Sequence, residues 1–110
     1  MGDRAMSQTV LYLVKSTVAS EHAAEFNRWY HQKHIPELVK LSGCEKGRRF
    51  KSIEGEDKYL YLAVYEFKDM ASFLRYQASD AKKYLVGDFK KLFGGKAELK
   101  GEVWEQIYPE

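Results

Sequence analysis

His34 and Tyr30 are the residues best suited to acid–base chemistry in this sequence. A neutral imidazole near its unperturbed pKa can take up or release a proton at cellular pH. The two residues lie one helical turn apart, so a helix would place both side chains on one side. A structural role is the alternative for His34, because a histidine near the C-terminal end of a helix can hydrogen-bond the last carbonyl groups.

His31, His34 and Glu37 follow at intervals of three residues, with Cys44 nearby, and such a spacing can converge on a metal ion. Pro36 interrupts the helix that would align them, and no second paired motif follows. The sequence also lacks a CxxCH haem motif, a GxSxG nucleophile motif and a complete phosphate loop. We therefore expect no bound metal and no cofactor.

The composition indicates one compact domain of mixed charge. The 110 residues include 18 Lys and Arg against 16 Asp and Glu, one cysteine and 45% hydrophobic residues. A chain of this length can build one core without metal or disulfide cross-links. The formal charge of +2 gives no strong field for nucleic acid, and no apolar run is long enough to cross a membrane. We expect a cytoplasmic protein with a flexible leader at residues 1–8 and a single domain at residues 9–110.

Strands and helices must position the candidate residues, and the sequence indicates an alternating series of them. Runs rich in β-branched and aromatic residues predict strands, and apolar residues at helical spacing predict helices. The predicted strands cover residues 9–17, 47–53, 58–67 and 101–108. The predicted helical segments cover residues 20–34, a short turn at 36–43, a segment around residues 73–76 and residues 81–93.

Capping residues set the expected boundaries. Ser20 is the expected N-cap of the first helix, and Pro36 should end that helix near His34, because a residue before proline disfavours helical geometry. Asp69 or Ser72 should cap the second helical region. The order strand, helix, strand, strand, helix, strand predicts an α+β, ferredoxin-like βαββαβ fold with an antiparallel sheet and both helices on one face.

The strand at residues 58–67 is apolar on both faces, and one helix layer covers only one of them. Side chains alternate along it, with Leu60, Leu62 and Val64 on one face and Tyr59, Tyr61, Ala63, Tyr65 and Phe67 on the other. We expect the aliphatic face to lie under the helices and the tyrosine face to be bare. A second copy of the chain is the simplest cover, which predicts a homodimer whose two sheets form a barrel.

Aromatic rings and hydroxyl groups between two such sheets could line a cavity for a small hydrophobic or aromatic molecule. The expected wall comprises Tyr12, Trp29, Tyr61, Tyr65 and Trp104, with Tyr59 and Tyr108 as further candidates. Arg48 and Arg49 alternate across their strand, so one should face the partner sheet, and Arg49 is a candidate to hold a carboxylate or phenolate. The alternatives are a packed interface without a cavity and edge-strand arginines that discourage aggregation.

One segment carries a resemblance to a known family. The run Trp29-Tyr30-His31-Gln32-Lys33-His34-Ile35-Pro36-Glu37-Leu38, then Ser42-Gly43 and Gly47-Arg48-Arg49-Phe50, resembles the EthD-like proteins of the dimeric α+β barrel superfamily. Ser42 stands where relatives often have proline. The resemblance implies the barrel dimer, in a superfamily that includes cofactor-free monooxygenases, lactone isomerases, polyketide cyclases and haem enzymes, so the fold alone selects no reaction.

Two functions remain open from the sequence. The first is a cofactor-independent enzyme of isomerase, cyclase or monooxygenase type, with His34, Tyr30 and Arg49 as its catalytic candidates. The second is a non-catalytic small-molecule binding or assembly protein. An RNA-recognition module shares the strand order, but residues 58–65 lack the glycine of its motif and carry leucine at the inner aromatic positions, so we expect no nucleic-acid partner.

Overall fold

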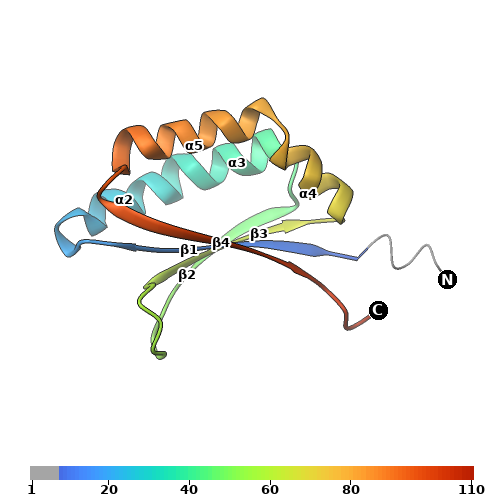
Figure 1. The fold of residues 1–110 in the computed structure, drawn as a ribbon, viewed down its shortest axis with the longest axis horizontal. Coiled ribbons are helices and arrows are strands. Elements are labelled where there is room, and N and C mark those ends of the chain that lie inside the picture. The colour runs from blue at the N-terminus through green and yellow to red at the C-terminus, as the bar shows by residue number, and fades with distance from the viewer. Residues whose placement is uncertain (1–7) are drawn as a thin grey trace.

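A computed structural model of the chain describes residues 8–110, and Figure 1 shows its arrangement. The strands are β1 (Val10–Val18), β2 (Lys46–Lys51), β3 (Tyr61–Phe67) and β4 (Ala97–Glu105). The helical segments are η1 (Ser20–His22), α2 (Ala23–Trp29), η2 (Tyr30–His34), α3 (Ile35–Ser42), α4 (Met70–Gln77) and α5 (Asp80–Phe93). Apart from residue 8, the predicted leader lies outside the described residues.

The four strands form one antiparallel sheet in the order β2-β3-β1-β4. All the helices lie on one side of the sheet, and the other side carries no helix in the described part of the chain (Figure 1). The predicted α+β, ferredoxin-like order of elements is therefore confirmed. No helix among residues 8–110 is long and apolar enough to cross a membrane.

Side-chain caps start α4 and α5, and of the two predicted capping positions one is confirmed. The Asp69 carboxylate accepts a hydrogen bond from the Ser72 backbone N–H at 2.8 Å, which starts α4 as predicted. The Ser79 hydroxyl accepts the backbone N–H of Lys82 at the start of α5. The prediction for Ser20 was wrong, because this residue lies inside the 3₁₀ turn η1 and its side chain makes no capping hydrogen bond.

The predicted helix end at His34 was also wrong, since helical structure runs from α2 through η2 into α3. The segment η2 is π-helical, and the N–H of Ile35 donates to the carbonyl of Tyr30, five residues earlier. Pro36 then falls in the first turn of α3, where its missing N–H costs little. The wider turn therefore lets the chain pass the proline without stopping.

The two faces of β3 are reversed relative to the prediction. Tyr65 and Phe67 are fully buried under the helices and Ala63 is 1% exposed, whereas Leu62 and Val64 lie on the bare face. Aromatic side chains on the helices explain this choice, because they pack ring against ring with the tyrosine face. Phe67 lies edge-on to Phe73 with ring centroids 5.4 Å apart.

Candidate functional site

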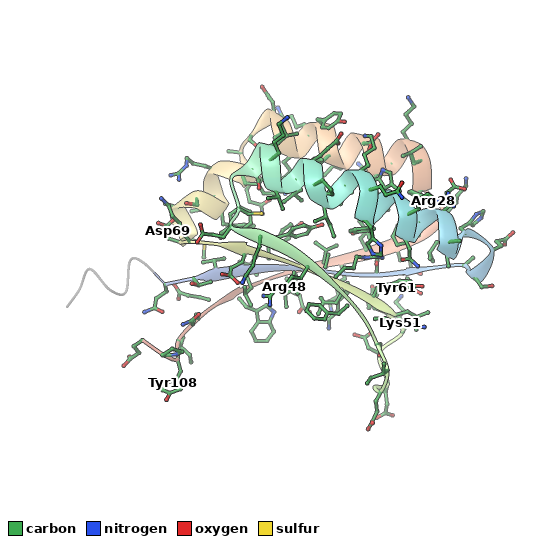
Figure 2. All side chains as sticks on the ribbon, turned by 180° about the vertical axis from the view of Figure 1, so that it is seen from behind. Arg28, Arg48, Lys51, Tyr61, Asp69 and Tyr108 are labelled. Carbon is green, nitrogen blue, oxygen red and sulfur yellow. The ribbon has the colours of Figure 1, made fainter. Side chains whose placement is uncertain are left out.

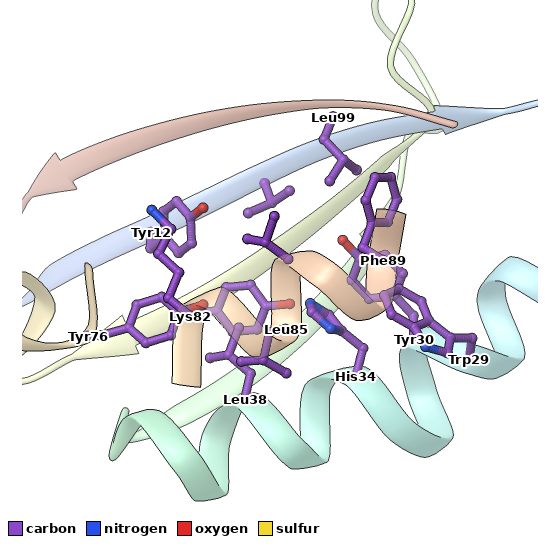
Figure 3. A pocket seen from close by; sticks show the side chains of 13 residues that line it. Tyr12, Trp29, Tyr30, His34, Leu38, Tyr76, Lys82, Leu85, Phe89 and Leu99 are labelled. Atoms are coloured by element: carbon purple, nitrogen blue, oxygen red, sulfur yellow. The ribbon is translucent and has the colours of Figure 1, made fainter. Parts of the chain in front are cut away.

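A small cavity lies between the sheet and the helices, with about 80 Å³ of free volume (Figure 3). Its walls are mostly aromatic and aliphatic side chains from the strands β1, β3 and β4 and from the helical segments α2, η2, α3, α4 and α5. The polar groups that reach it come from Tyr12, Tyr30, His34, Tyr65, Tyr76 and Lys82. Such a lining, apolar with a few convergent polar groups, is typical of small-molecule sites.

His34 enters this cavity from the last position of the π-helical segment η2. Its ring stacks on Trp29, with centroids 4.5 Å apart and an interplanar angle of 21°, and meets the Tyr30 ring edge-on at 5.0 Å. Neither ring nitrogen hydrogen-bonds to a described residue, and Nδ1 is fully buried. His34 therefore does not cap a helix end.

Burial keeps the His34 imidazole neutral. Desolvation lowers the pKa of His34 to about 4, against a smaller opposing effect of Asp88 and Glu37. At cellular pH the ring thus has one nitrogen that can accept a proton or hydrogen bond and one that can donate.

The tyrosines around the cavity are neutral hydrogen-bond donors. Burial raises the pKa of Tyr30 to about 12 and also raises the pKa values of Tyr12, Tyr65 and Tyr76. The Tyr65 hydroxyl is buried and has no hydrogen-bond partner in the described structure. An unpaired buried hydroxyl is costly, so a ligand oxygen or water at this position would satisfy it.

A polar network outside the cavity holds Trp29 against His34. The Trp29 indole N–H donates to the Asp88 carboxylate at 3.2 Å, and the Lys33 ammonium donates to the same carboxylate at 2.8 Å. Lys33 also lies 3.4 Å from Glu37, which accepts the Tyr84 hydroxyl. Burial opposes ionisation of Asp88, but Lys33 and Trp29 hold its pKa below the usual value. The network ties α5 to η2 and α3.

Arg49 lies behind Tyr30 and does not line the cavity. Its guanidinium lies 3.9 Å from the centre of the Tyr30 ring and 4.7 Å from that of Tyr61. Nη1 donates to Asn27 Oδ1 at 2.7 Å and lies 3.2 Å from His31 Nε2. Burial lowers the pKa of Arg49. Arg49 thus extends from β2 towards the helices and packs against the Tyr30 ring from outside the cavity.

Arg48, and not Arg49, lies on the bare face of the sheet (Figure 2). It forms an ion pair with Glu66 at 3.5 Å. The sequence predicted that one of these two arginines would face away from the helices, and that residue is Arg48. Arg49, the candidate to hold a carboxylate or phenolate, lies on the helix side of the sheet, and this role stays a prediction. The alternation was correct, but the sequence did not show which face the helices cover.

Most of the predicted cavity residues come together, although on the helix side of the sheet. Tyr12, Trp29, Tyr30, His34 and Tyr65 all line the cavity. Tyr61, also predicted as a wall residue, does not line the cavity; its hydroxyl accepts a hydrogen bond from the Asn27 side chain at 3.3 Å.

Trp104 is the clear exception among the predicted wall residues. It is 58% exposed and pairs with Leu11 on the bare face, so it cannot share a wall with the tyrosines. Tyr108 is 86% exposed and lies beyond the end of β4, away from the helices (Figure 2).

Sequence reasoning missed the wall supplied by α4 and α5, above all Tyr76, Lys82, Leu85 and Phe89. The helical spacing of Leu85 and Phe89 was the available signal. The described residues contain no group of three or more metal-ligating side chains that could hold a metal ion. His31 points to Arg49 while His34 points into the cavity, so the two histidines diverge.

Comparison with known proteins adds a family and a fold. A family model described as "Domain of unknown function (DUF4286)" matches residues 9–107. "Core atranone cluster (CAC) protein 1" of Stachybotrys chlorohalonatus is 35% identical over 48 residues, which are 44% of this chain and 20% of that protein. The matched segment therefore spans about a fifth of the length of that curated relative.

Two solved structures illustrate the shared fold. An ethyl tert-butyl ether d (EthD) family protein from Bacillus halodurans is 19% identical with a TM-score of 0.69, covering 91% of this chain and 99% of its own. SnoaB from Streptomyces nogalater, a cofactor-independent oxygenase, is 16% identical with a TM-score of 0.66, covering 93% and 98%. The predicted EthD-like resemblance is thus confirmed at the level of the fold.

Proposed function

The chain belongs to the DUF4286 family, and since the description of that family assigns no activity, we propose a function from the cavity. The function is that of a cofactor-independent enzyme that performs acid–base chemistry on a small hydrophobic or aromatic molecule. The reaction would be of isomerase, cyclase or monooxygenase type. The observation that carries this proposal is the neutral, unpaired imidazole of His34 inside an aromatic cavity. The fold shared with SnoaB, described as a cofactor-independent oxygenase, supports chemistry without a cofactor.

In this proposal His34 takes a proton from an activated C–H or O–H group of the bound molecule. The electron pair stays on the substrate as an enolate or phenolate, whose oxygen accepts a hydrogen bond from the Tyr65 hydroxyl. Tyr30 remains protonated at cellular pH and acts as a second donor or as a wall. The proton then returns from the imidazolium to another atom of the substrate, so no external reductant or oxidant is needed for this step.

The test has two stages. Aromatic acids, lactones and polyketide-like phenols are first screened for an increase in the melting temperature of the protein. Compounds that bind are then incubated in D₂O, and NMR measures the rate of deuterium exchange at their activated C–H positions. We expect the protein to accelerate this exchange.

His34→Gln should lower the exchange rate by about 100-fold or more while the compound still binds. His22→Gln is the matched control, because His22 lies in η1 away from the cavity and should leave the rate unchanged. Binding without any accelerated exchange would contradict the enzyme proposal.

A non-catalytic binding protein is the second candidate, and one observation favours it. In the described structure no carboxylate or carbonyl hydrogen-bonds to the His34 ring, so the ring lacks the hydrogen-bonded third group that orients the base in many proton-transfer sites. Ligand-induced stabilisation that is equal in wild type and His34→Gln, without exchange, would select this function.

We also propose that the protein is a homodimer through the bare face of the sheet. The centre of that face is apolar, with Leu11, Leu13, Leu62 and Val64 on adjacent strands. No helix of the described chain covers it. The face differs from the predicted one, since it is aliphatic and the tyrosines lie on the other side.

A further inference from the structure

The cavity is closed at its inner end and open towards one side of the molecule. Leu38, Leu85 and Tyr65 are at most 2% exposed and form the inner wall. Leu99 of β4 and Val86 of α5 line the same cavity but are 40% and 38% exposed. These partly exposed side chains mark the mouth of the cavity, which therefore lies between α5 and the edge strand β4.

His34 and the mouth lie on opposite sides of the cavity. In the close view, Leu99 lies beside β4, and His34 lies on the far side, beside α3 (Figure 3). Phe89 is a third apolar side chain on the side of the mouth, so a ligand that passes there contacts Val86, Phe89 and Leu99. Apolar walls at an opening favour a chain of methylene groups, because the chain and the walls both lose water-exposed apolar surface on contact.

The free volume limits the part of a ligand that can enter. A cavity of roughly 150 Å³ holds benzene, which is about 25 Å³ for each of its carbon atoms. The free volume of about 80 Å³ therefore holds about three heavy atoms, which excludes a ring. An oxygen and two carbons at the end of an unbranched chain are a group of this size.

The inner end of the cavity suits a neutral oxygen function. The Tyr65 hydroxyl is buried without a hydrogen-bond partner in the described structure, and the His34 ring is neutral at cellular pH. No carboxylate of residues 8–110 lines the cavity, and the Lys82 ammonium donates to the Gln77 side-chain carbonyl. A charged end group would therefore be buried without an opposite charge, which is costly, whereas a carbonyl oxygen can accept the Tyr65 hydroxyl.

We propose that the cavity takes the terminal carbonyl group of a straight-chain aliphatic aldehyde, whose chain leaves through the apolar mouth between α5 and β4. The inference rests on the proposed function and names the substrate class of the same cavity. His34 then takes a proton from the carbon next to the carbonyl group. The electron pair of that C–H bond forms the carbon–carbon double bond of an enolate, and the negative charge passes to the oxygen at Tyr65.

Two unreactive alcohols of seven carbons each test the shape of the ligand. 1-Heptanol ends in an oxygen and two unbranched carbons, whereas cyclohexylmethanol carries a saturated ring at its second carbon. Isothermal titration calorimetry measures both affinities in wild type. We expect 1-heptanol to bind about tenfold more tightly or better, because the ring would overpack the inner end of the cavity.

Leu99→Trp tests the mouth, because the larger ring would close the gap between α5 and β4 and weaken the binding of 1-heptanol by about tenfold or more. Val86→Trp closes the same gap from α5 and serves as the second variant if the first does not fold. Leu92→Trp is the matched control, since Leu92 is 37% exposed on α5 but does not line the cavity. Thermal unfolding checks that each variant is folded.

Other results would overturn the inference. Equal affinity for the two alcohols, no binding of 1-heptanol, or full affinity in both mouth variants would each refute the straight-chain class. The proposed function is tested apart from this, by deuterium exchange at the second carbon of heptanal in D₂O. Selective binding of 1-heptanol without exchange that depends on His34 would refute the enzyme and leave the chain-binding site standing. Exchange that depends on His34, together with equal affinity for the two alcohols, would refute only the straight-chain class.

Discussion

At the scale of single residues, the most unusual feature is a histidine held neutral by its surroundings. The His34 ring is packed against Trp29 and Tyr30 and gains no hydrogen bond in the described structure to offset its loss of water. A protonated ring would be unstable there, because no carboxylate touches it. Folding therefore becomes linked to the protonation of this one side chain.

We predict that the free energy of unfolding falls as the pH is lowered from about 6.5 to about 4. The unfolded His34 binds a proton near pH 6.5, while burial lowers its pKa to about 4 in the folded protein. In this window the unfolded state binds more protons, so stability is full above it and is lost as the pH falls. This lowering of the His34 pKa corresponds to a loss of about 3 kcal/mol at most in the free energy of unfolding. Urea denaturation at several pH values measures it.

The matching variant is His34→Gln, which should remove most of this dependence on pH. His31→Gln is the control, since His31 is exposed and should leave the dependence as in wild type. If His34→Gln and wild type lost stability in parallel between pH 6.5 and 4, the neutral state of His34 would be refuted.

Residue spacing predicted part of this site and could not have predicted the rest. Tyr30 and His34 are one turn apart, so their shared position follows from any helix through them. Asp88 and Lys82 contact or complete the site from α5, some 50 residues later in the chain. No local pattern encodes such a contact, because it depends on how α5 packs over the first helical region.

At the scale of elements, the close approach of α3 to β2 positions the end of the π-helical segment. Gly47 makes this approach possible, because a Cβ atom there would lie 2.9 Å from Ile35 Cγ2 and 3.3 Å from Tyr65 Cδ1. Ile35 directly follows His34, so a shift at this contact would move the histidine. The glycine therefore contributes to the geometry of the site without touching it.

We predict that Gly47→Ala destabilises the protein by about 1–3 kcal/mol, through overpacking between α3 and the sheet. The control is Gly87→Ala in α5, where a Cβ atom would meet nothing within 4 Å. That substitution should stabilise the protein by about 0.5–1 kcal/mol through helix propensity. Thermal and urea unfolding of the two variants measure both changes, and a Gly47→Ala protein as stable as wild type would contradict the close packing.

The sequence predicted the order of elements but not the face of the sheet that they cover. Alternation shows that Tyr61, Ala63 and Tyr65 share a face, and this was correct. Both faces of β3 are apolar, however, so the pattern could not show which one lies under the helices. The aromatic residues of α2 and α4 decide it, because Phe26 and Phe73 pack against the rings of the tyrosine face.

At the scale of the whole molecule, the structure is two layers deep, with the helices on one side of the sheet and none of the described helices on the other (Figure 1). The bare side carries apolar side chains. Val64 at the centre of this face is 6% exposed, while Phe50 and Trp104 towards its edges are about half exposed at 48% and 58%. Charged residues surround the apolar centre, among them Arg48, Glu66 and Lys15. An apolar centre with a polar rim is the usual composition of a protein interface.

We predict that the wild-type protein is a dimer at micromolar concentration and that Leu13→Glu dissociates it. A two-fold axis would bring the altered position into the interface from both copies, so two carboxylates would be buried for each dimer, and the dissociation constant should rise by at least 100-fold. Leu13 is partly exposed on the bare face, so the monomer should stay folded.

Leu74→Glu is the control, because Leu74 is 56% exposed on α4 in the helix layer and should leave the dimer intact. Sedimentation velocity across a range of concentrations measures the equilibrium. If the wild-type protein sedimented as a monomer even at 100 times the micromolar concentration, the bare face would stay open to solvent. If only Leu74→Glu dissociated the dimer, the interface would lie on the helices instead.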